Sequence, residues 1–529
     1  MIERIGISED ESETHKVYSK QALLTAVARA LRTWGLPALV CYALARSLVY
    51  AALKPLWFDE VLTYVVSRQG SLSAIWAALR QGVDGNPPAF YLMERGASFL
   101  APNEHVGYRL PSVCGFACTL IFLFIFVKRR HGVERALLCS SVLLITPLFT
   151  LYAEEARPYS LVTALIALAM VCYQRLPAAK WAVGLCFSLV FAALLHHYAV
   201  MAFLPFFLAE LSHVYYSRQT RLGPWLALLV ALGPLTISWP MLMWMKHNWG
   251  PHFWVGATLS DVSAAYGSFF RLGAPWGVAL CGMTVLAMLA TIRRASRGKA
   301  TAVFPRVPIS EHVLLLGLVV LPIIGFAVAR ATHGPFVERY FLAAILGIVV
   351  AAIYGLDYTN SKSLPAVGFA LLFAISAQEF GFWKSLGNRE RPADIVAPIA
   401  NLAGTARYQT LPIVISDAGE YVEFWHYAPP ALLRRVVTFP NPEDATIYAG
   451  VNTVDKLVLA LRSYVPAKIQ DFPSFEATHP AFLLYSNGSR YDWWPAKLAH
   501  DGYQLELLSL PGSAAVYLVG PKHRTTAID

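Results

Sequence analysis

Charged residues are scarce in this chain of 529 residues. Asp, Glu, Lys and Arg make up 14% of it, against about 25% in a typical soluble domain. Hydrophobic residues make up 56% of the chain, and the mean hydropathy is +0.49. Its long apolar runs would expose too much apolar surface in water. The composition therefore excludes a soluble globular protein and predicts an integral membrane protein.

Three further features are missing. The N-terminal stretch MIERIGISEDESETHK lacks the basic segment of a cleavable signal peptide, so we expect the first apolar run to stay attached as an anchor. The chain has no cysteine after Cys281, so its C-terminal part can hold no disulfide. We find no internal repeat of the kind that many transporters carry.

The net charge of +10 has a simple origin. In a soluble domain it would indicate nucleic-acid binding. Here Lys and Arg cluster in short loops between apolar runs, as expected for loops that stay in the cytoplasm. We therefore expect membrane lipids, and no nucleic acid, among the partners.

Runs of about twenty apolar residues predict about eleven transmembrane helices. They lie at 34–53, 111–127, 134–152, 159–175, 181–197, 199–216, 223–244, 273–292, 312–331, 340–356 and 364–382. Basic loops such as KRRHGVER and RRASRGK fall on one side, which the positive-inside rule makes cytoplasmic. The N-terminal segment 1–33 is then cytoplasmic. The first outer loop, 54–110, and the tail from 383 lie outside.

The tail, 383–529, has a different pattern. Short runs rich in β-branched and large apolar residues, LPIVISD, LLRRVVTF, AFLLYS, LELLSL and AAVYLVG, predict strands. VDKLVLALRSYV has the spacing of an amphipathic helix. We predict one mixed α/β domain, long enough to hold its own core.

Polar motifs collect on the outer side, in the order FDE, DGNPPAFYLMERG, YRLPSVCGF, LYAEEARPYSL, LLHHYA and ERYFLAAI. Over residues 30–380 this ordered set resembles the GT-C glycosyltransferases of the dolichyl-phosphate-mannose protein mannosyltransferase and aminoarabinose transferase superfamily, in particular its bacterial PMT-2-like branch. The resemblance implies a polytopic α-helical GT-C domain over 34–382, in the bacterial inner membrane, followed by the extracytoplasmic tail domain.

The resemblance also implies a reaction. The family transfers a sugar from a polyprenyl-phosphate donor to an acceptor on the extracytoplasmic side. This chemistry needs a carboxylate base for the acceptor and cations for the leaving phosphate. The acceptor class, whether lipid, glycan or protein, stays open, as do the sugar, hexosyl or pentosyl, and the need for a divalent cation.

Asp59 and Glu60, in WFDE, are the catalytic candidates. The resemblance implies that Asp59 is the general base, while Glu60 either holds an acceptor group or orients Asp59. The alternative is a pair of acids favoured by the dipole of the helix that they begin.

Asp84, in DGNPPAF, is either a helper carboxylate, part of a cation site or a plain turn residue. Aminoarabinose transferases carry Glu-Lys before the proline, where this chain has Gly85 and Asn86. The difference argues against both a metal ligand and a lysine contact to phosphate at these positions.

Further substrate-binding candidates come from three later motifs. Glu154 and Arg157, in YAEEARPY, are three apart, so both can face the site or form a local ion pair. His196, His197 and Tyr198 end the fifth span as ligands or as packed residues. Arg339 and Tyr340 match the family's Arg-Tyr before a late span, where we expect them to bind lipid phosphate; a snorkelling arginine is the alternative.

A transporter or flippase of a lipid-linked or anionic substrate is the other function considered, because many spans with membrane-level charges also fit it. The position of the charges separates the two functions. A transport path needs them near the bilayer midplane, whereas here they collect at one face.

Overall fold

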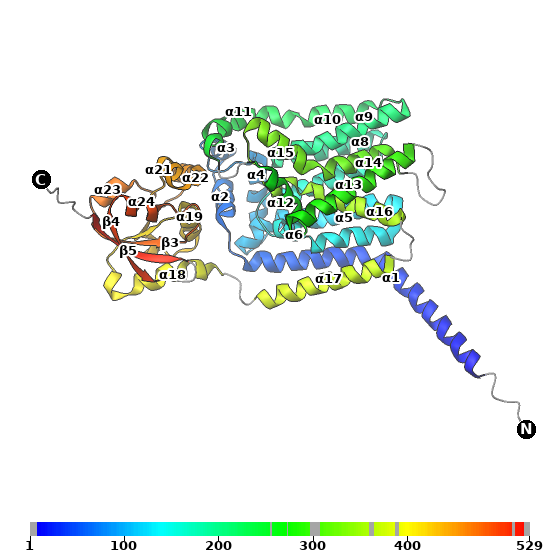
Figure 1. Ribbon diagram of the computed structural model, residues 1–529, viewed down its shortest axis with the longest axis horizontal. Coiled ribbons are helices and arrows are strands. Elements are labelled where there is room, and N and C mark those ends of the chain that lie inside the picture. The colour runs from blue at the N-terminus through cyan, green and yellow to red at the C-terminus, as the bar shows by residue number, and fades with distance from the viewer. Residues whose placement is uncertain are drawn as a thin grey trace, which may run out of the picture.

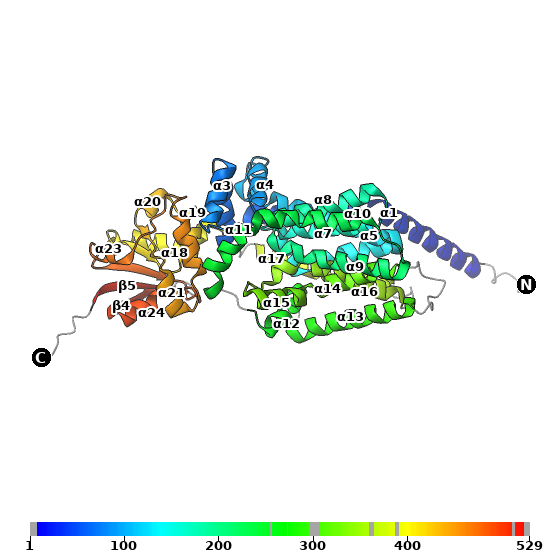
Figure 2. The ribbon, with the colours of Figure 1, turned by 90° about the horizontal axis from the view of Figure 1, so that it is seen from above.

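The computed structural model describes residues 8–253, 257–271, 273–296, 307–358, 364–386, 391–509 and 514–522. Figure 1 shows a long bundle of helices with the C-terminal tail at one end and the N-terminus beyond the other end. Figure 2, seen from above, places the short helices α3 and α4 at the junction between the bundle and the tail.

The bundle consists of helices that run roughly along its length (Figure 1). They are α1 (Ser8–Leu53), α5 (Glu104–Val142), α7 (Tyr159–Tyr173), α8 (Ala179–Leu195), α9 (Phe203–Ser217), α10 (Leu222–Ala231), α11 (Gly233–Asn248), α13 (Ala274–Ser296), α14 (Ile309–Val319), α15 (Leu321–Thr332), α16 (Ala343–Tyr358) and α17 (Leu364–Ser385). Shorter elements join them: η1 (Leu143–Ile145), α6 (Pro147–Ala153), η2 (His197–Ala202), η3 (Gly250–His252), α12 (Leu259–Phe269) and η4 (Glu338–Phe341).

Each of the eleven predicted spans falls on helix. The spans at 111–127 and 134–152 meet within α5, which is broken at Gly132, where φ is 82°. Among the described residues, five helices are long and apolar enough to cross a membrane, or six if α14 and α15, bent by 54°, form one span. The helical membrane fold is therefore confirmed, while the count of eleven stays a prediction.

The first outer loop is mostly helical. It contains α2 (Phe58–Ser67), α3 (Leu72–Arg80) and α4 (Pro88–Ser98). Proline begins α4, where its missing N–H costs nothing and its fixed φ suits the first helical turn. The loop thus presents Asp59 in the first turn of α2 and Asp84 just before α4.

The tail contains the predicted small sheet. Its strands are β1 (Ile413–Ile415), β2 (Val436–Val437), β3 (Phe482–Ser486), β4 (Tyr503–Ser509) and β5 (Ala515–Lys522), in the order β2-β1-β3-β5-β4. The pairs β1–β2 and β1–β3 are parallel, and β3–β5 and β4–β5 are antiparallel. The five predicted strand segments all contain a strand.

Helices surround this sheet (Figure 1). They are α18 (Pro392–Gly404), α19 (Ala418–Tyr427), α20 (Pro430–Leu433), α21 (Pro442–Ala449), α22 (Thr453–Leu461), α23 (Phe472–Glu476) and α24 (Trp494–His500). The predicted amphipathic helix is α22. The domain boundary at 383 stays a prediction, because α17 continues to Ser385 and residues 387–390 lie outside the described ranges.

The core of the tail continues into the first outer loop. One side of the sheet has its own apolar cluster, around Phe439, Trp494 and Leu484. The other side shares a cluster with the loop, in which Ile415 and Val422 pack together with residues such as Val61 of α2. Burial of this apolar surface, at about 25 cal/mol per Å², fixes α2 between the bundle and the tail.

Candidate functional site

Asp59 lies at the end of the bundle that faces the tail. Trp57 precedes α2 in extended conformation, so Asp59 falls in the first turn, where the helix dipole favours an anion. Its Oδ2 lies 3.6 Å from Nη2 of Arg339 and 3.9 Å from Nη2 of Arg157. The side chain is 18% exposed, so a partly accessible carboxylate stands between two guanidinium groups.

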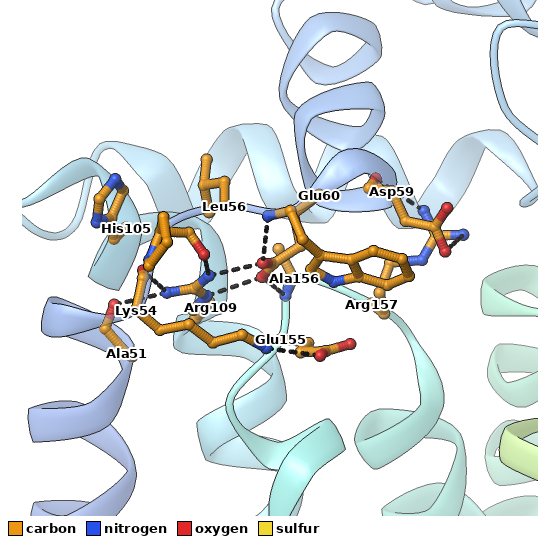
Figure 3. A network of polar contacts seen from close by, with 12 residues as sticks. Ala51, Lys54, Leu56, Asp59, Glu60, His105, Arg109, Glu155, Ala156 and Arg157 are labelled. Atoms are coloured by element: carbon orange, nitrogen blue, oxygen red, sulfur yellow. Dashed lines mark hydrogen bonds and ion pairs between the residues drawn. The ribbon is translucent and has the colours of Figure 1, made fainter. Parts of the chain in front are cut away.

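Arg157 joins the two candidate aspartates. Its Nη1 donates to Oδ2 of Asp84 at 2.7 Å and to the backbone oxygen of Asp59 at 3.1 Å. Burial alone would lower the pKa of Arg157, but Asp84 and Asp59 raise it well above its usual value. Figure 3 shows Arg157 directed toward Asp59. The arginine is therefore a permanent cation held in place by carboxylates on both sides.

Asp84 belongs to the site through this arginine. Its Oδ1 accepts the Gly85 N–H at 2.6 Å, and that contact fixes the turn before α4. The neighbouring Asn86 is buried, and its Nδ2 has no hydrogen-bond partner. Among the described residues, no group of three or more His, Cys, Asp or Glu side chains lies close enough together to hold a metal ion.

Glu60 points away from Asp59, into the protein (Figure 3). Both Glu60 and Arg109 are 0% exposed, and they form a two-pronged pair at 2.7 and 2.6 Å. Glu60 Oε1 also accepts the Ala156 N–H at 2.6 Å. Burial would raise the pKa of Glu60, but Arg109, Lys54 and this N–H hold it below its usual value. These contacts favour the orienting role over acceptor binding.

Glu154 lies apart from Arg157. Helix α6 ends at Ala153, so residues 154–157 do not continue it and the helical i, i+3 pairing does not form. Glu154 instead pairs with Arg46 of α1, which also contacts Glu379 of α17 at 2.8 Å. The structure therefore places Glu154 in a contact between helices and not beside Asp59.

The remaining candidates, except His197, line an aromatic cavity next to Arg339. The volume of this cavity is about 20 Å³, and it is lined by His196, Tyr198, Arg339 and Tyr340 together with Tyr159. The ring of Tyr340 lies 4.5 Å from that of Tyr198 and 4.9 Å from that of His196. The guanidinium carbon of Arg339 lies 5.8 Å from the centres of the Tyr159 and Tyr340 rings.

His197 does not line this cavity. Its ring is buried, and neither ring nitrogen has a hydrogen-bond partner. The structure therefore brings together Asp59, Asp84, Arg157 and Arg339, and sets His196, Tyr198 and Tyr340 beside them. Glu60, Glu154 and His197 lie outside this group.

Sequence reasoning missed two buried side chains near the site. Tyr159 follows the RP of YAEEARPY, so the motif contained the signal. Glu94 of α4 is 0% exposed, and neither of its carboxyl oxygens has a hydrogen-bond partner. Burial and the charge of Glu60 raise the pKa of Glu94 well above its usual value, although Arg157 opposes them. The surroundings of Glu94 therefore favour the neutral form of its carboxyl group.

Sequence reasoning also missed the part of the tail that touches this region. The N–H of Phe58 donates to Oε1 of Glu423 at 2.7 Å, and the N–H of Leu56 donates to the hydroxyl of Tyr427 at 2.5 Å. Both acceptors lie on α19, more than 360 residues along the chain. No local signal marks them, because the contact depends on how the tail packs.

A search of protein-family models found no match, and neither did a search of curated protein sequences. Two solved structures of ArnT from Cupriavidus metallidurans are similar to this chain. The structure bound to undecaprenyl phosphate is 12% identical, with a TM-score of 0.54, and the match covers 91% of this chain and 97% of that one. The apo structure is 13% identical, with a TM-score of 0.43, over 92% and 98%.

The match to the undecaprenyl-phosphate complex shows a shared fold over nearly the whole chain, tail included. ArnT is an aminoarabinose transferase with the GT-C fold. The resemblance drawn from the ordered outer motifs is therefore confirmed for the fold.

Proposed function

We propose that this chain is a membrane glycosyltransferase that takes its sugar from a polyprenyl-phosphate donor. The observation that carries the proposal is the Asp59 carboxylate facing Arg157 and Arg339 at the tail end of the bundle. A base and two cations side by side supply what sugar transfer from a lipid phosphate needs. The ArnT structure with this fold is bound to undecaprenyl phosphate, which supports the donor class.

In the proposed reaction, Asp59 accepts the proton of the acceptor hydroxyl or amine as that group attacks the anomeric carbon. The bond from that carbon to the phosphate oxygen breaks, and its electron pair leaves with the phosphate. Arg339 stabilises the growing negative charge, and guanidinium groups suit phosphate because they donate two parallel hydrogen bonds. Arg157, neutralised in part by Asp84, adds a second contact.

The rim of the cavity suits the same donor. Tyr340 and Tyr198 line the cavity together with Arg339, and apolar residues such as Leu321 and Ala343 complete its wall. A polyprenyl phosphate has a charged head and an apolar chain, so it matches a cation beside an aromatic and aliphatic wall. We propose that Arg339, Tyr340, Tyr198 and His196 surround the phosphate and the first part of the lipid.

The proposed location follows from the same arrangement. The N-terminus and the tail lie at opposite ends of the bundle (Figure 1). Together with the basic loops, this supports a multi-pass protein of the bacterial inner membrane with a cytoplasmic N-terminus and an extracytoplasmic tail. The site lies near the end of the bundle and not midway along it, which supports a surface enzyme over a transporter.

The test replaces Asp59 by Asn, which preserves the shape of the side chain and removes its basicity. We expect turnover to fall by about 10²–10⁴, the usual contribution of a positioned base. Undecaprenyl-phosphate binding to the purified protein should remain. Mass spectrometry of envelope lipids and glycans from strains that carry the wild type, Asp59→Asn or no copy identifies the product and measures the loss.

The exposed Glu443→Gln in the tail is the matched control and should behave as the wild type. An Asp59→Asn strain with a wild-type envelope, beside a deletion strain that lacks one component, would rule out Asp59 as the base. Asp84 would then be tested next. An unchanged envelope in the deletion strain would speak against the transferase function itself.

A further inference from the structure

An open groove of about 450 Å³ lies between the first outer loop and the tail. The loop and the start of α5 contribute Tyr64, Glu104 and His105, and α19 contributes Trp425, His426 and Tyr427. We call it the interface groove. Ligand sites often occupy such junctions between two folded units.

The walls of the interface groove are held together by ring contacts. The rings of Tyr64 and His426 meet edge to face, 4.7 Å apart. The hydroxyl of Tyr427 lies 3.1 Å from Nε2 of His105. The groove is therefore built from side chains of both units, and docking of the tail onto the loop forms it.

The polar groups of the groove are close to neutral overall. Burial, together with His105 and Arg68, lowers the pKa of His426 to about 4. Burial also lowers the pKa of His105, with a further contribution from Arg109. Both rings are therefore uncharged at pH 7. Nε2 of His105 is occupied by the Tyr427 hydroxyl, whereas the neutral ring of His426 can donate one hydrogen bond and accept another.

The one carboxylate of the groove lining has a cation beside it. Oε1 of Glu104 lies 3.6 Å from Nη1 of Arg68, whose guanidinium carbon lies 5.0 Å from the centre of the Tyr64 ring. The groove thus offers no excess positive charge to a phosphate. Its aliphatic lining consists of Ala428, Leu433 and Pro466.

Aromatic rings beside uncharged donors and acceptors suit a molecule with both C–H faces and hydroxyl groups. We propose that the interface groove binds an uncharged saccharide, and that this saccharide is part of the acceptor. Its identification as the acceptor rests on the proposed transferase function, whereas saccharide binding does not. Trp425 would stack on the sugar ring, and His426 and Glu104 would bind its hydroxyl groups.

The groove is connected to the base through α19. Tyr427 accepts the N–H of Leu56, and Glu423 accepts that of Phe58, at 2.5 and 2.7 Å. These backbone groups directly precede Asp59 in the chain. The helix that lines the groove therefore also supports the start of the helix that carries the base.

The test uses saturation-transfer NMR and Trp fluorescence on the full-length protein in nanodiscs. The probes are methyl α-mannoside, methyl β-galactoside and chitobiose. We expect at least one probe to bind, with binding weakened at least tenfold in Trp425→Ala and largely retained in Trp425→Phe. Phe99→Ala, an exposed ring of the same loop outside the groove, is the control and should bind as the wild type.

Two results would overturn the proposal: no binding of any probe to the wild type, or equal binding by wild type and Trp425→Ala. Displacement of the bound probe by undecaprenyl phosphate would assign the groove to the donor instead. If Trp425→Ala unfolds, as its thermal midpoint would show, His426→Gln replaces it. If the probes bind but the Asp59→Asn variant still modifies the envelope, the transferase mechanism is contradicted. The assignment of the groove to a saccharide then remains valid.

Discussion

Replacing each of the adjacent carboxylates Asp59 and Glu60 by its amide should have different effects. Glu60→Gln should mainly lower stability, and Asp59→Asn should mainly lower turnover. Glu60→Gln removes the charge that neutralises Arg109, and both side chains are 0% exposed. The three backbone carbonyls that also accept from Arg109, those of Ala51, Lys54 and Pro55, supply no counter-charge. The guanidinium would then stay buried and uncompensated.

Loss of one partner of a buried ion pair costs about 3–5 kcal/mol. Native proteins have about 5–15 kcal/mol of stability in total, so this is a large share. The pair also connects the end of α1, the start of α2, helix α5 and the N–H of Ala156. At about 2.1 cal/mol/K per residue, the unfolding entropy of 529 residues is about 1.1 kcal/mol/K, so we expect the thermal midpoint of purified Glu60→Gln to fall by about 3–5 °C.

Asp59→Asn is the matched control, with the same change one residue earlier. Its carboxylate is 18% exposed and its ion pairs are longer, 3.6 and 3.9 Å. It should therefore lose little stability and most of its turnover. The assay measures thermal unfolding and sugar transfer on the same preparations.

A Glu60→Gln protein that melts like the wild type but has lost as much turnover as Asp59→Asn would refute this reasoning. It would place Glu60 in the chemistry. The double variant Glu60→Gln/Arg109→Met provides a second check. Removing both charges should recover part of the stability that Glu60→Gln loses, because the uncompensated cation is then gone.

Three further predictions concern the donor, the topology and the tail. Arg157→Ala and Arg339→Ala should each weaken undecaprenyl-phosphate binding about ten- to hundredfold, since hydrogen bonds to charged groups contribute about 1.5–3 kcal/mol; unchanged binding in both variants would reject the phosphate clamp. Single cysteines at the exposed positions 71, 102 and 450, in a cysteine-free background, should react with an impermeant thiol reagent from outside and one at the exposed position 129 should not; a protected cysteine at 450 would contradict an extracytoplasmic tail. Burial, with Asp417 and Glu423, raises the pKa of Glu420 in the folded protein to about 8, against 4.5 in the unfolded chain. The folded protein therefore holds the proton more tightly, and the stability that this proton contributes is present below pH 4.5 and is lost as pH rises toward 8. Glu420→Gln should therefore melt above the wild type at pH 8 and at the same temperature at pH 4, whereas the exposed Glu443→Gln should shift neither midpoint.

Local sequence pattern predicted most of the secondary structure. Apolar runs of span length became helices, and short β-branched runs such as those in β1 and β3 became strands, because each signal lies within a few neighbouring residues. The order of the outer motifs also indicated the fold. In the site, the pattern singled out Asp59, Arg157 and Arg339, and these side chains do lie together.

The sequence pattern did not predict which partner each charged side chain of the site has. Asp59 and Glu60 are neighbours in sequence, yet successive residues of a helix point about 100° apart, so one faces two arginines and the other enters the core. Glu154 and Arg157 are close in sequence but bind Arg46 and Asp84. Such choices depend on what the rest of the fold brings near each residue.

The sequence by itself determined the membrane class, the helices, the small sheet of the tail and the position of the first acidic pair, since all of these depend on composition and short-range spacing. Tertiary structure alone decided that Glu60 is neutralised by Arg109, 49 residues later, and that α19 docks on α2. The physical reason is that burial of apolar surface brings distant segments together. Each buried charge or backbone N–H must then find its partner among the groups that this packing provides.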